Sequence, residues 1–312
     1  MAQIYVTNSL GTNAGKAAGS VKMGRPKVLL MTRGANPTAS DLADSDSLFA
    51  FVKSCMNSNR TASAKIFLID GLHEAEDKTG DPQKGTLADG YEEVLNEALP
   101  KFIFKLTKGV AEQQSLVTFN GWNDKVFIID DKGIFWYRGD GGTGGVGFSV
   151  GAFYAKPPNF GNTGNINVGI IDMTFANIDE FKNNVGALKI GFTSADLPNI
   201  VDAALSSVSA TGYAFKVAVK NKYQGSSIGA AYAVGLAQSG AWGVTLPDGT
   251  NVVVSSVAYD ATTDSFTVTV ASSPTITTGV KLKFVLNDPS ILAGLVTPVL
   301  GIEGVPVLIA KP

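Results

Sequence analysis

The sequence is poor in the residues that most often carry chemistry, and it has little charge. Among 312 residues there is one cysteine, Cys55, and one histidine, His73. A disulfide framework within the chain is therefore excluded, and a Cys/His zinc site or a Cys-His catalytic pair would need these two residues to meet. Charged residues make up 17% of the chain and the net charge is -2, so no overall basic field favours nucleic acid. With 45% hydrophobic residues, the chain is not of the highly charged, disordered class.

Signals for export and for membrane insertion are also missing. The first residues lack a charged segment followed by a long apolar run, so we expect no secretory signal. The most apolar stretch, residues 291–310, is as long as a membrane span but contains Glu303, Pro298 and Pro306. A helix with these breakers would leave backbone groups unpaired in lipid, so we expect strands and turns here and no membrane partner.

The residues that are abundant favour strands and turns. The chain has 35 glycines and many short apolar runs. Residues 1–26 are polar and carry Lys16, Lys22 and Arg25 without any acid, which predicts either a floppy terminus or an extended N-terminal arm that becomes ordered on a neighbouring subunit. We expect a β-rich assembly domain over residues 27–205, and a change to a much less charged composition marks a last domain, residues 206–312. The fold class predicted is mainly β with a few short helices (α+β), as a barrel or sandwich followed by a second sandwich.

Three helices are predicted in the first part. Leu48, Phe49 and Val52 recur at helical spacing within residues 45–57. A second helix is expected over residues 86–99, capped by Thr86, and a short third helix from Asn177, which stands three residues before Glu180 as in a capping box. The strands expected here are residues 27–32, 64–70, 101–107, 115–120, 125–130, 133–137, 146–155, 166–175 and 187–192.

The pattern of residues 206–312 predicts a succession of strands separated by frequent turns. Pro247-Asp248-Gly249 is one such turn, because glycine supplies a positive φ. The expected strands are residues 213–220, 242–246, 251–259, 265–271, 281–286 and 305–310. This spacing predicts an immunoglobulin-like β-sandwich of the kind that has no disulfide.

The candidate chemical motifs are weak. Residues 139–144 satisfy G-x-G-x-x-G, but a strand and not a helix is expected to follow, so nucleotide binding is not favoured. His73, Glu74, Glu76, Asp77 and Asp81 form the densest acidic group, which we expect to be a solvated loop. We therefore predict no catalytic residue, no cofactor and no metal site, and no enzyme activity.

The order of elements resembles a known family. A polar N-terminal segment precedes a β-rich domain with one main helix. A glycine-rich loop links two hairpins, and a small sandwich is appended. The segments FNGWNDKVFIIDD (residues 119–131) and DMTFANIDEF (residues 172–181) carry the resemblance best. In this layout the chain is similar to the major tail (tail tube) proteins of tailed bacteriophages that have a C-terminal immunoglobulin-like domain.

The resemblance implies a structural virion protein, assembled in the host cytoplasm, whose copies form hexameric rings stacked into a tube for DNA passage. Its partners would be itself, other virion tail or neck proteins, DNA in the lumen, and cell-surface glycans touched by residues 206–312. Carried over by position, inter-subunit contacts fall on the acidic loop 72–85, the glycine loop 139–147 and the residues Lys16, Lys22, Arg25, Arg138, Asp140, Gly141 and Gly144.

Two other functions stay open. A phage capsid shell protein fits the length, but it usually carries a long spine helix, and no helical pattern here is that long. A glycan-binding module or adhesin, from a different class, would fit the last domain and the aromatic residues Trp122, Trp136, Tyr137, Phe153 and Tyr154.

Overall fold

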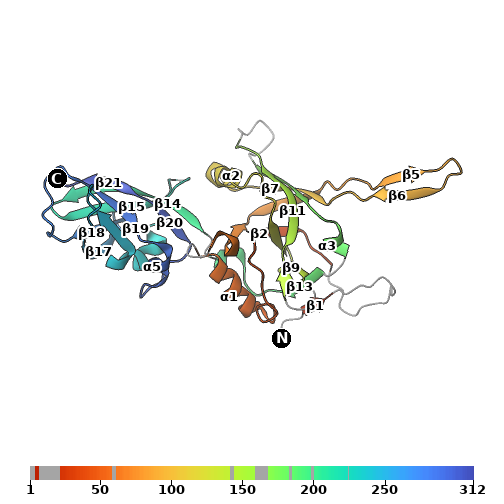
Figure 1. Cartoon of the computed structure of the whole chain (residues 1–312), viewed down its shortest axis with the longest axis horizontal. Helices are drawn as coiled ribbons and strands as arrows, with labels where there is room; N and C mark the ends of the chain where they lie inside the picture. Colours follow the sequence, from red (N-terminus) through yellow and green to blue (C-terminus); the bar gives the residue numbers. More distant parts are fainter. Residues whose placement is uncertain are drawn as a thin grey trace. The chain divides into compact units, whose positions relative to one another are not determined.

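The computed structural model describes residues 4–6, 22–57, 61–140, 144–158, 168–182, 185–197, 200–223 and 225–312. The chain divides into two compact units (Figure 1): residues 1–55 with 62–197, and residues 56–61 with 198–312. Strands make up 44% and helices 16%, so the prediction of a mainly β class with a few short helices is confirmed. The border expected after residue 205 falls inside a strand of the second unit, Val201–Thr211.

In its described residues, the first unit contains three α-helices, a large branched sheet and a separate two-stranded sheet. The helices are α1 (Ser45–Cys55), α2 (Val110–Val117) and α3 (Asp179–Lys182), with short 3-10 turns η1 (Ala62–Ala64) and η2 (Ser194–Asp196). The strands are β1 (Ile4–Val6), β2 (Pro26–Thr32), β3 (Ile66–Ile69), β4 (Leu72–Asp77), β5 (Gln83–Thr86), β6 (Glu92–Asn96), β7 (Lys101–Leu106), β8 (Lys125–Asp130), β9 (Ile134–Gly139), β10 (Gly145–Val146), β11 (Phe148–Ala155), β12 (Gly169–Phe175) and β13 (Val185–Lys189).

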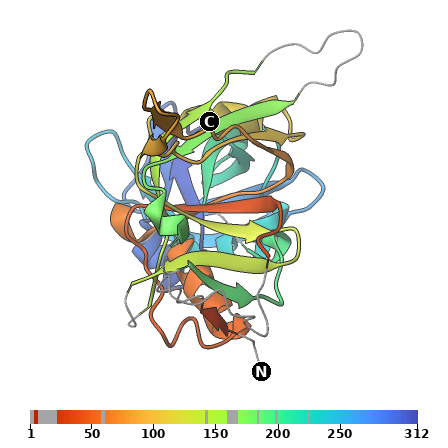
Figure 2. The same ribbon diagram turned by 90° about the vertical axis from the view of Figure 1, so that its right-hand side faces the viewer.

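The sheet forks at β8. One edge of β8 pairs along its length with β2, which pairs in turn with β3. On the other edge, Ile128 and Ile129 pair with β9, whereas Lys125 and Val126 pair with β11. One limb then continues as β9-β13-β1 and the other as β11-β12-β7-β4. Figure 2 shows β2, β8, β9 and β13 side by side in this order, from red-orange through yellow-green to green.

Both limbs of the fork share one hydrophobic core. Alternate residues of the central strands, such as Met31, Val126 and Trp136, join one buried cluster. The same cluster contains Phe104 and Phe175 from the second limb. Since each fully buried side chain of this size contributes roughly 2–3 kcal/mol, this cluster holds the two limbs together as layers.

Helix α1 forms where the sequence predicts a helix. Leu48, Val52 and Cys55 are its buried residues, and their spacing puts them on one face. The carboxylate of Asp44 accepts a hydrogen bond from the N–H of Ser47 (2.7 Å) and so caps the first turn. Phe49 packs on Phe192 with ring centroids 5.1 Å apart, which sets the start of α1 beside the end of β13.

Three local predictions are wrong. Residues 86–99 are not a helix, because β5 and β6 pair as an antiparallel hairpin there. Residues 115–120 are not a strand, because they form the end of α2 and the turn after it. The acidic segment expected as a loop from residue 72 begins instead with β4, which pairs with β7.

The second unit is a sandwich of two sheets. Its strands are β14 (Val201–Thr211), β15 (Ala214–Asn221), β16 (Trp242–Thr245), β17 (Val254–Asp260), β18 (Ser265–Val270), β19 (Lys281–Leu286), β20 (Ile302–Val305) and β21 (Val307–Ala310), with helices α4 (Ala233–Leu236) and α5 (Pro289–Ala293) and turns η3 (Ala230–Tyr232) and η4 (Ser239–Ala241). The strand order is β17-β18-β15-β14-β20 in one sheet and β16-β19-β21 in the other. All six strands predicted for this part of the chain have counterparts.

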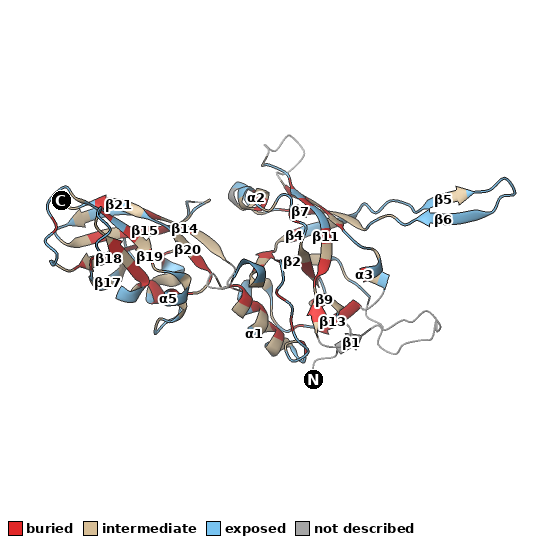
Figure 3. Cartoon of the chain, in the orientation of Figure 1, coloured by how far each residue is buried: buried red, intermediate tan, exposed pale blue. Residues whose placement is uncertain are grey.

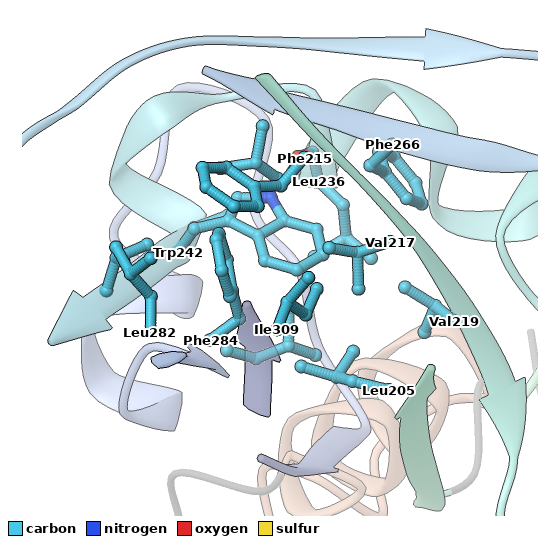
Figure 4. Close-up of a cluster of buried hydrophobic side chains, with 14 of the residues drawn as sticks. Leu205, Phe215, Val217, Val219, Leu236, Trp242, Phe266, Leu282, Phe284 and Ile309 are labelled. Atoms are coloured by element: carbon cyan, nitrogen blue, oxygen red, sulfur yellow. Dashed lines mark hydrogen bonds between the residues drawn. The ribbon is translucent and has the colours of Figure 1, made fainter. Parts of the chain in front are cut away.

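The core of the second unit lies between these sheets. Phe215 and Val217 of β15 and Phe284 of β19 are fully buried and point toward one another (Figure 4). Trp242 joins them, and its indole N–H donates to the carbonyl of Leu236 (2.8 Å), so its polar group is satisfied inside the core. Among the described residues, no helix is both long and apolar enough to cross a lipid bilayer.

Candidate assembly surface

A two-stranded ribbon projects from the first unit, and we call residues 78–100 the arm. The arm continues the β4–β7 pair: Asp77 lies opposite Phe102, and the N–H of Lys78 donates to the carbonyl of Lys101 (2.8 Å). Strands β5 and β6 then run out together to a turn at residues 87–91 (Figure 1).

The turn at the tip explains why these residues form a hairpin. The N–H of Leu87 donates to the carbonyl of Tyr91 (2.8 Å), and the carboxylate of Asp89 accepts from the N–H of Tyr91 (3.1 Å). Gly90 between them has a φ of +87°, which glycine adopts without the steric cost that other residues incur. Asp-Gly at this place is a hairpin signal.

The arm exposes large apolar side chains. Leu87 is 62% exposed, Tyr91 58% and Leu95 69%, and Val94 and Leu99 are exposed as well (Figure 3). Leu95 lies across Gly85, where an added Cβ would come within 3.1 Å of its side chain. An isolated two-stranded ribbon is at best marginally stable in water. Contiguous exposed apolar groups are typical of surfaces that another molecule covers.

The root of the arm is held against the rest of the first unit. Lys182 of α3 forms an ion pair with Glu97, and the N–H of Phe175 in β12 donates to the carbonyl of Pro100 (2.9 Å). A hollow of about 460 Å³ lies between the arm and the loop before α3, lined by Val94, Leu99 and Ile178 among others. These contacts give the arm a defined starting direction.

The arm is acidic. It carries five acids, Asp81, Asp89, Glu92, Glu93 and Glu97, against two lysines. Both lysines are already paired, Lys78 with Glu76 (2.5 Å) and Lys84 with Glu92 (3.2 Å). The hydrogen bond from Lys78 lowers the pKa of the Glu76 carboxyl, so this pair stays charged. The arm therefore presents a negative surface with apolar residues among the charges.

The assembly residues predicted near the N-terminus lie at the turn between β8 and β9, except Lys16, which falls outside the described residues. The carbonyl of Lys22 accepts from the Lys132 ammonium (3.4 Å). The N–H of Arg25 donates to the Asp131 carboxylate (3.1 Å), and its guanidinium lies 4.0 Å from the same group. Lys22 and Arg25 remain exposed.

The assembly residues predicted around the glycine loop bond within the chain. Arg138 donates to the buried Glu180 carboxylate (2.8 Å). Asp140 accepts from the N–H of Gly144 (2.7 Å), and a Cβ on Gly144 would lie 2.3 Å from the carbonyl of Pro37. These contacts stabilise the first unit itself; Gly141 lies outside the described residues.

The weak chemical motifs gain no support as sites. His73 lies on β4 and its Nε2 contacts the Thr107 hydroxyl (2.5 Å), while Glu74 pairs with Lys105 (2.6 Å). Within the part of the chain that the structure describes, no three metal-ligating side chains gather. Strand β10 begins at Gly145, directly after the G-x-G-x-x-G residues, whereas a dinucleotide fingerprint needs a helix to begin there.

Comparison of the sequence with models of known protein families found no match, and comparison with curated proteins found none either. The predicted contact segment, residues 72–85, forms β4 and the outgoing part of the arm, but sequence reasoning missed that residues 86–100 return beside it as the second strand of a hairpin. Its Asp89-Gly90 dipeptide was the signal that would have located it.

Proposed function

We propose that this protein is a structural subunit that assembles with copies of itself, and that each arm lies on a neighbouring subunit. The observation that carries the proposal is the arm: a two-stranded ribbon whose apolar side chains have no cover among the described residues of its own chain. Its 23 residues match the roughly 20–30 residues that one partner contributes to a stable interface.

One further feature supports the narrower proposal of a tail-tube-like subunit. The first unit combines a β-rich core with one main helix, which are elements that the resemblance implies. In this proposal the copies stack as hexameric rings into a tube in the virion, and DNA passes through the tube. Closure of strand edges between subunits removes the exposed edges that a single ribbon leaves.

We propose that the second unit is immunoglobulin-like. Its order β17-β18-β15-β14 corresponds to strands D-E-B-A of the constant type, and β16-β19-β21 corresponds to C-F-G. The buried Trp242 on β16 stands where such domains carry a tryptophan on strand C. In this proposal the second unit is attached to the domain that assembles, and it contacts molecules outside the assembly.

Removing the arm tests the proposal. In the variant, residues 80–99 are replaced by Asn-Gly, which closes a two-residue hairpin next to the point where Lys78 and Lys101 already pair. We expect the unmodified chain to form rings or tubes and the variant to stay monomeric with an unchanged circular dichroism spectrum. Assembly of a folded variant at the same concentration as the unmodified chain would overturn the proposal.

A further inference from the structure

A second charged surface lies on the first unit, and we call it the basic patch: Lys22, Arg25, Lys132 and Lys189. Hydrogen bonds gather these residues, from the Lys132 ammonium to the carbonyl of Lys22 (3.4 Å) and from the Lys189 ammonium to the carbonyl of Lys132. All four are exposed, and exposed Met23 lies among them in sequence.

The acids near the basic patch leave it positive. Asp131 is the exposed acid there, at 4.0 Å from Arg25. Asp130 is only 2% exposed, and its carboxylate is taken up by four N–H donors of the chain. The four cations of the basic patch are therefore exposed to solvent, and among the described residues Asp131 is the exposed acid that contacts them.

The arm and the basic patch lie near opposite ends of β8. The arm starts beside Phe175, which lies opposite Val150, and the preceding Ser149 pairs with Lys125, the first residue of β8. The basic patch surrounds Asp131 and Lys132, just after the last residue of β8. The two surfaces differ, so a contact between them is head-to-tail: it leaves one arm and one patch unoccupied at the ends and permits a ring or an open stack.

We propose that the acidic arm of one copy docks on the basic patch of the next copy. This inference rests on the proposed function and names the partner surface. The charges are complementary, because the five acids of the arm exceed its two lysines by three, whereas the basic patch has four cations with one acid, Asp131, in contact. Along the arm, ten residues in extended conformation reach about 30 Å, enough to span much of a neighbouring unit. Apolar residues of the arm and Met23 would add contact area.

Paired charge reversals in the full-length protein test this docking. The arm variant is Asp81→Lys with Glu93→Lys, two exposed acids that take no part in the ion pairs of the arm, and the patch variant is Lys22→Glu with Lys132→Glu. The control is Lys281→Glu with Lys283→Glu, two exposed lysines of β19 in the second unit. Light scattering measures the protein concentration at which half of the chains are assembled, and circular dichroism checks that each variant is folded.

We expect the arm variant and the patch variant each to raise the half-assembly concentration at least about tenfold, because like charges then face each other. Combining the two variants restores opposite charges and should bring the half-assembly concentration back to within about threefold of the unmodified chain. The control should leave it unchanged, and added salt should weaken assembly of the unmodified chain.

The possible failures are distinguishable. If the unmodified chain assembles but neither reversal weakens assembly, or the combined variant does not recover, this docking is wrong while self-assembly stands. If the unmodified chain does not assemble at any concentration, the proposed function itself is wrong.

Discussion

At the residue scale, Asp130 organises the turn that presents the basic patch. Its buried carboxylate accepts from the N–H groups of Gly24 (2.9 Å), Lys132 (2.9 Å) and Ile134 (3.0 Å). The indole N–H of Trp136 is the fourth donor (2.9 Å). One side chain thus ties residues 22–25 and the β8–β9 turn to the core.

Replacing Asp130 by alanine should therefore destabilise the protein strongly. We expect a loss of about 3 kcal/mol in the free energy of unfolding, because several buried donors lose a charged acceptor. Asp131→Ala, at the exposed neighbour, should cost less than about 1 kcal/mol. Denaturant unfolding of both variants measures this difference, and equal losses would contradict the role assigned to Asp130.

Asp260 gives a pH-dependent prediction in the second unit. A hydrogen bond from the Lys216 ammonium, followed by bonds from Thr263 and the N–H of Thr262, lowers the pKa of the Asp260 carboxyl below its ordinary value of 3.8. The folded state then holds this proton less tightly than the unfolded state, so the stabilisation is present above the unfolded pKa and fades as pH falls through the folded one.

The variant Asp260→Asn should consequently unfold more easily than the unmodified chain near pH 5, and the difference should shrink toward about pH 2. Thermal unfolding of both proteins over this range measures it. A difference that stays constant or grows at low pH would show that the Asp260 charge has no part in stability.

At the scale of elements, the arm shows where sequence patterns mislead. Leu87, Tyr91, Val94 and Leu95 repeat at helical spacing, and Thr86 is a good N-cap, so the pattern predicts a helix. An amphipathic helix needs a core against which to bury its stripe, and in the structure these residues have none. The Asp89-Gly90 turn and strand pairing determine the local conformation instead.

Prediction succeeds where a single segment carries the whole signal. Helix α1 follows from the helical spacing of its apolar residues, and strands β8 and β9 follow from their own short apolar runs. The basic patch is different: Lys22 and Arg25 are visible as cations without acids, but Lys132 and Lys189 join them only through tertiary contacts. A local sequence pattern does not indicate contacts between residues that are 110 or 57 positions apart in the chain.

Leu87 at the arm tip allows a matched test of the exposed apolar residues. Leu87 and Leu308 of β21 are both 62% exposed, so Leu→Ser removes the same apolar group from two equally exposed places. We expect Leu87→Ser to weaken self-association about tenfold or less and Leu308→Ser to leave it unchanged. Sedimentation velocity measures both, and equal effects would argue against a specific role of the arm.

At the scale of the whole molecule, two units with separate cores share one chain. The sequence places their border at residue 205 from a drop in charge, whereas the contacts divide the chain at residue 197. Charge density carries no information about strand pairing. Strand β14 runs across the expected border and pairs with β15 and β20, so the border cannot lie there. Because each unit has its own core, the first unit can assemble as we propose while the second unit packs on its own.

Negative-stain microscopy of the purified full-length protein, with the particle mass measured by light scattering, tests the central claim most directly. The account predicts closed rings or stacked tubes whose mass is an integral multiple of 32.5 kDa and grows with concentration. A uniform population of 32.5 kDa monomers at the highest attainable concentration would contradict it.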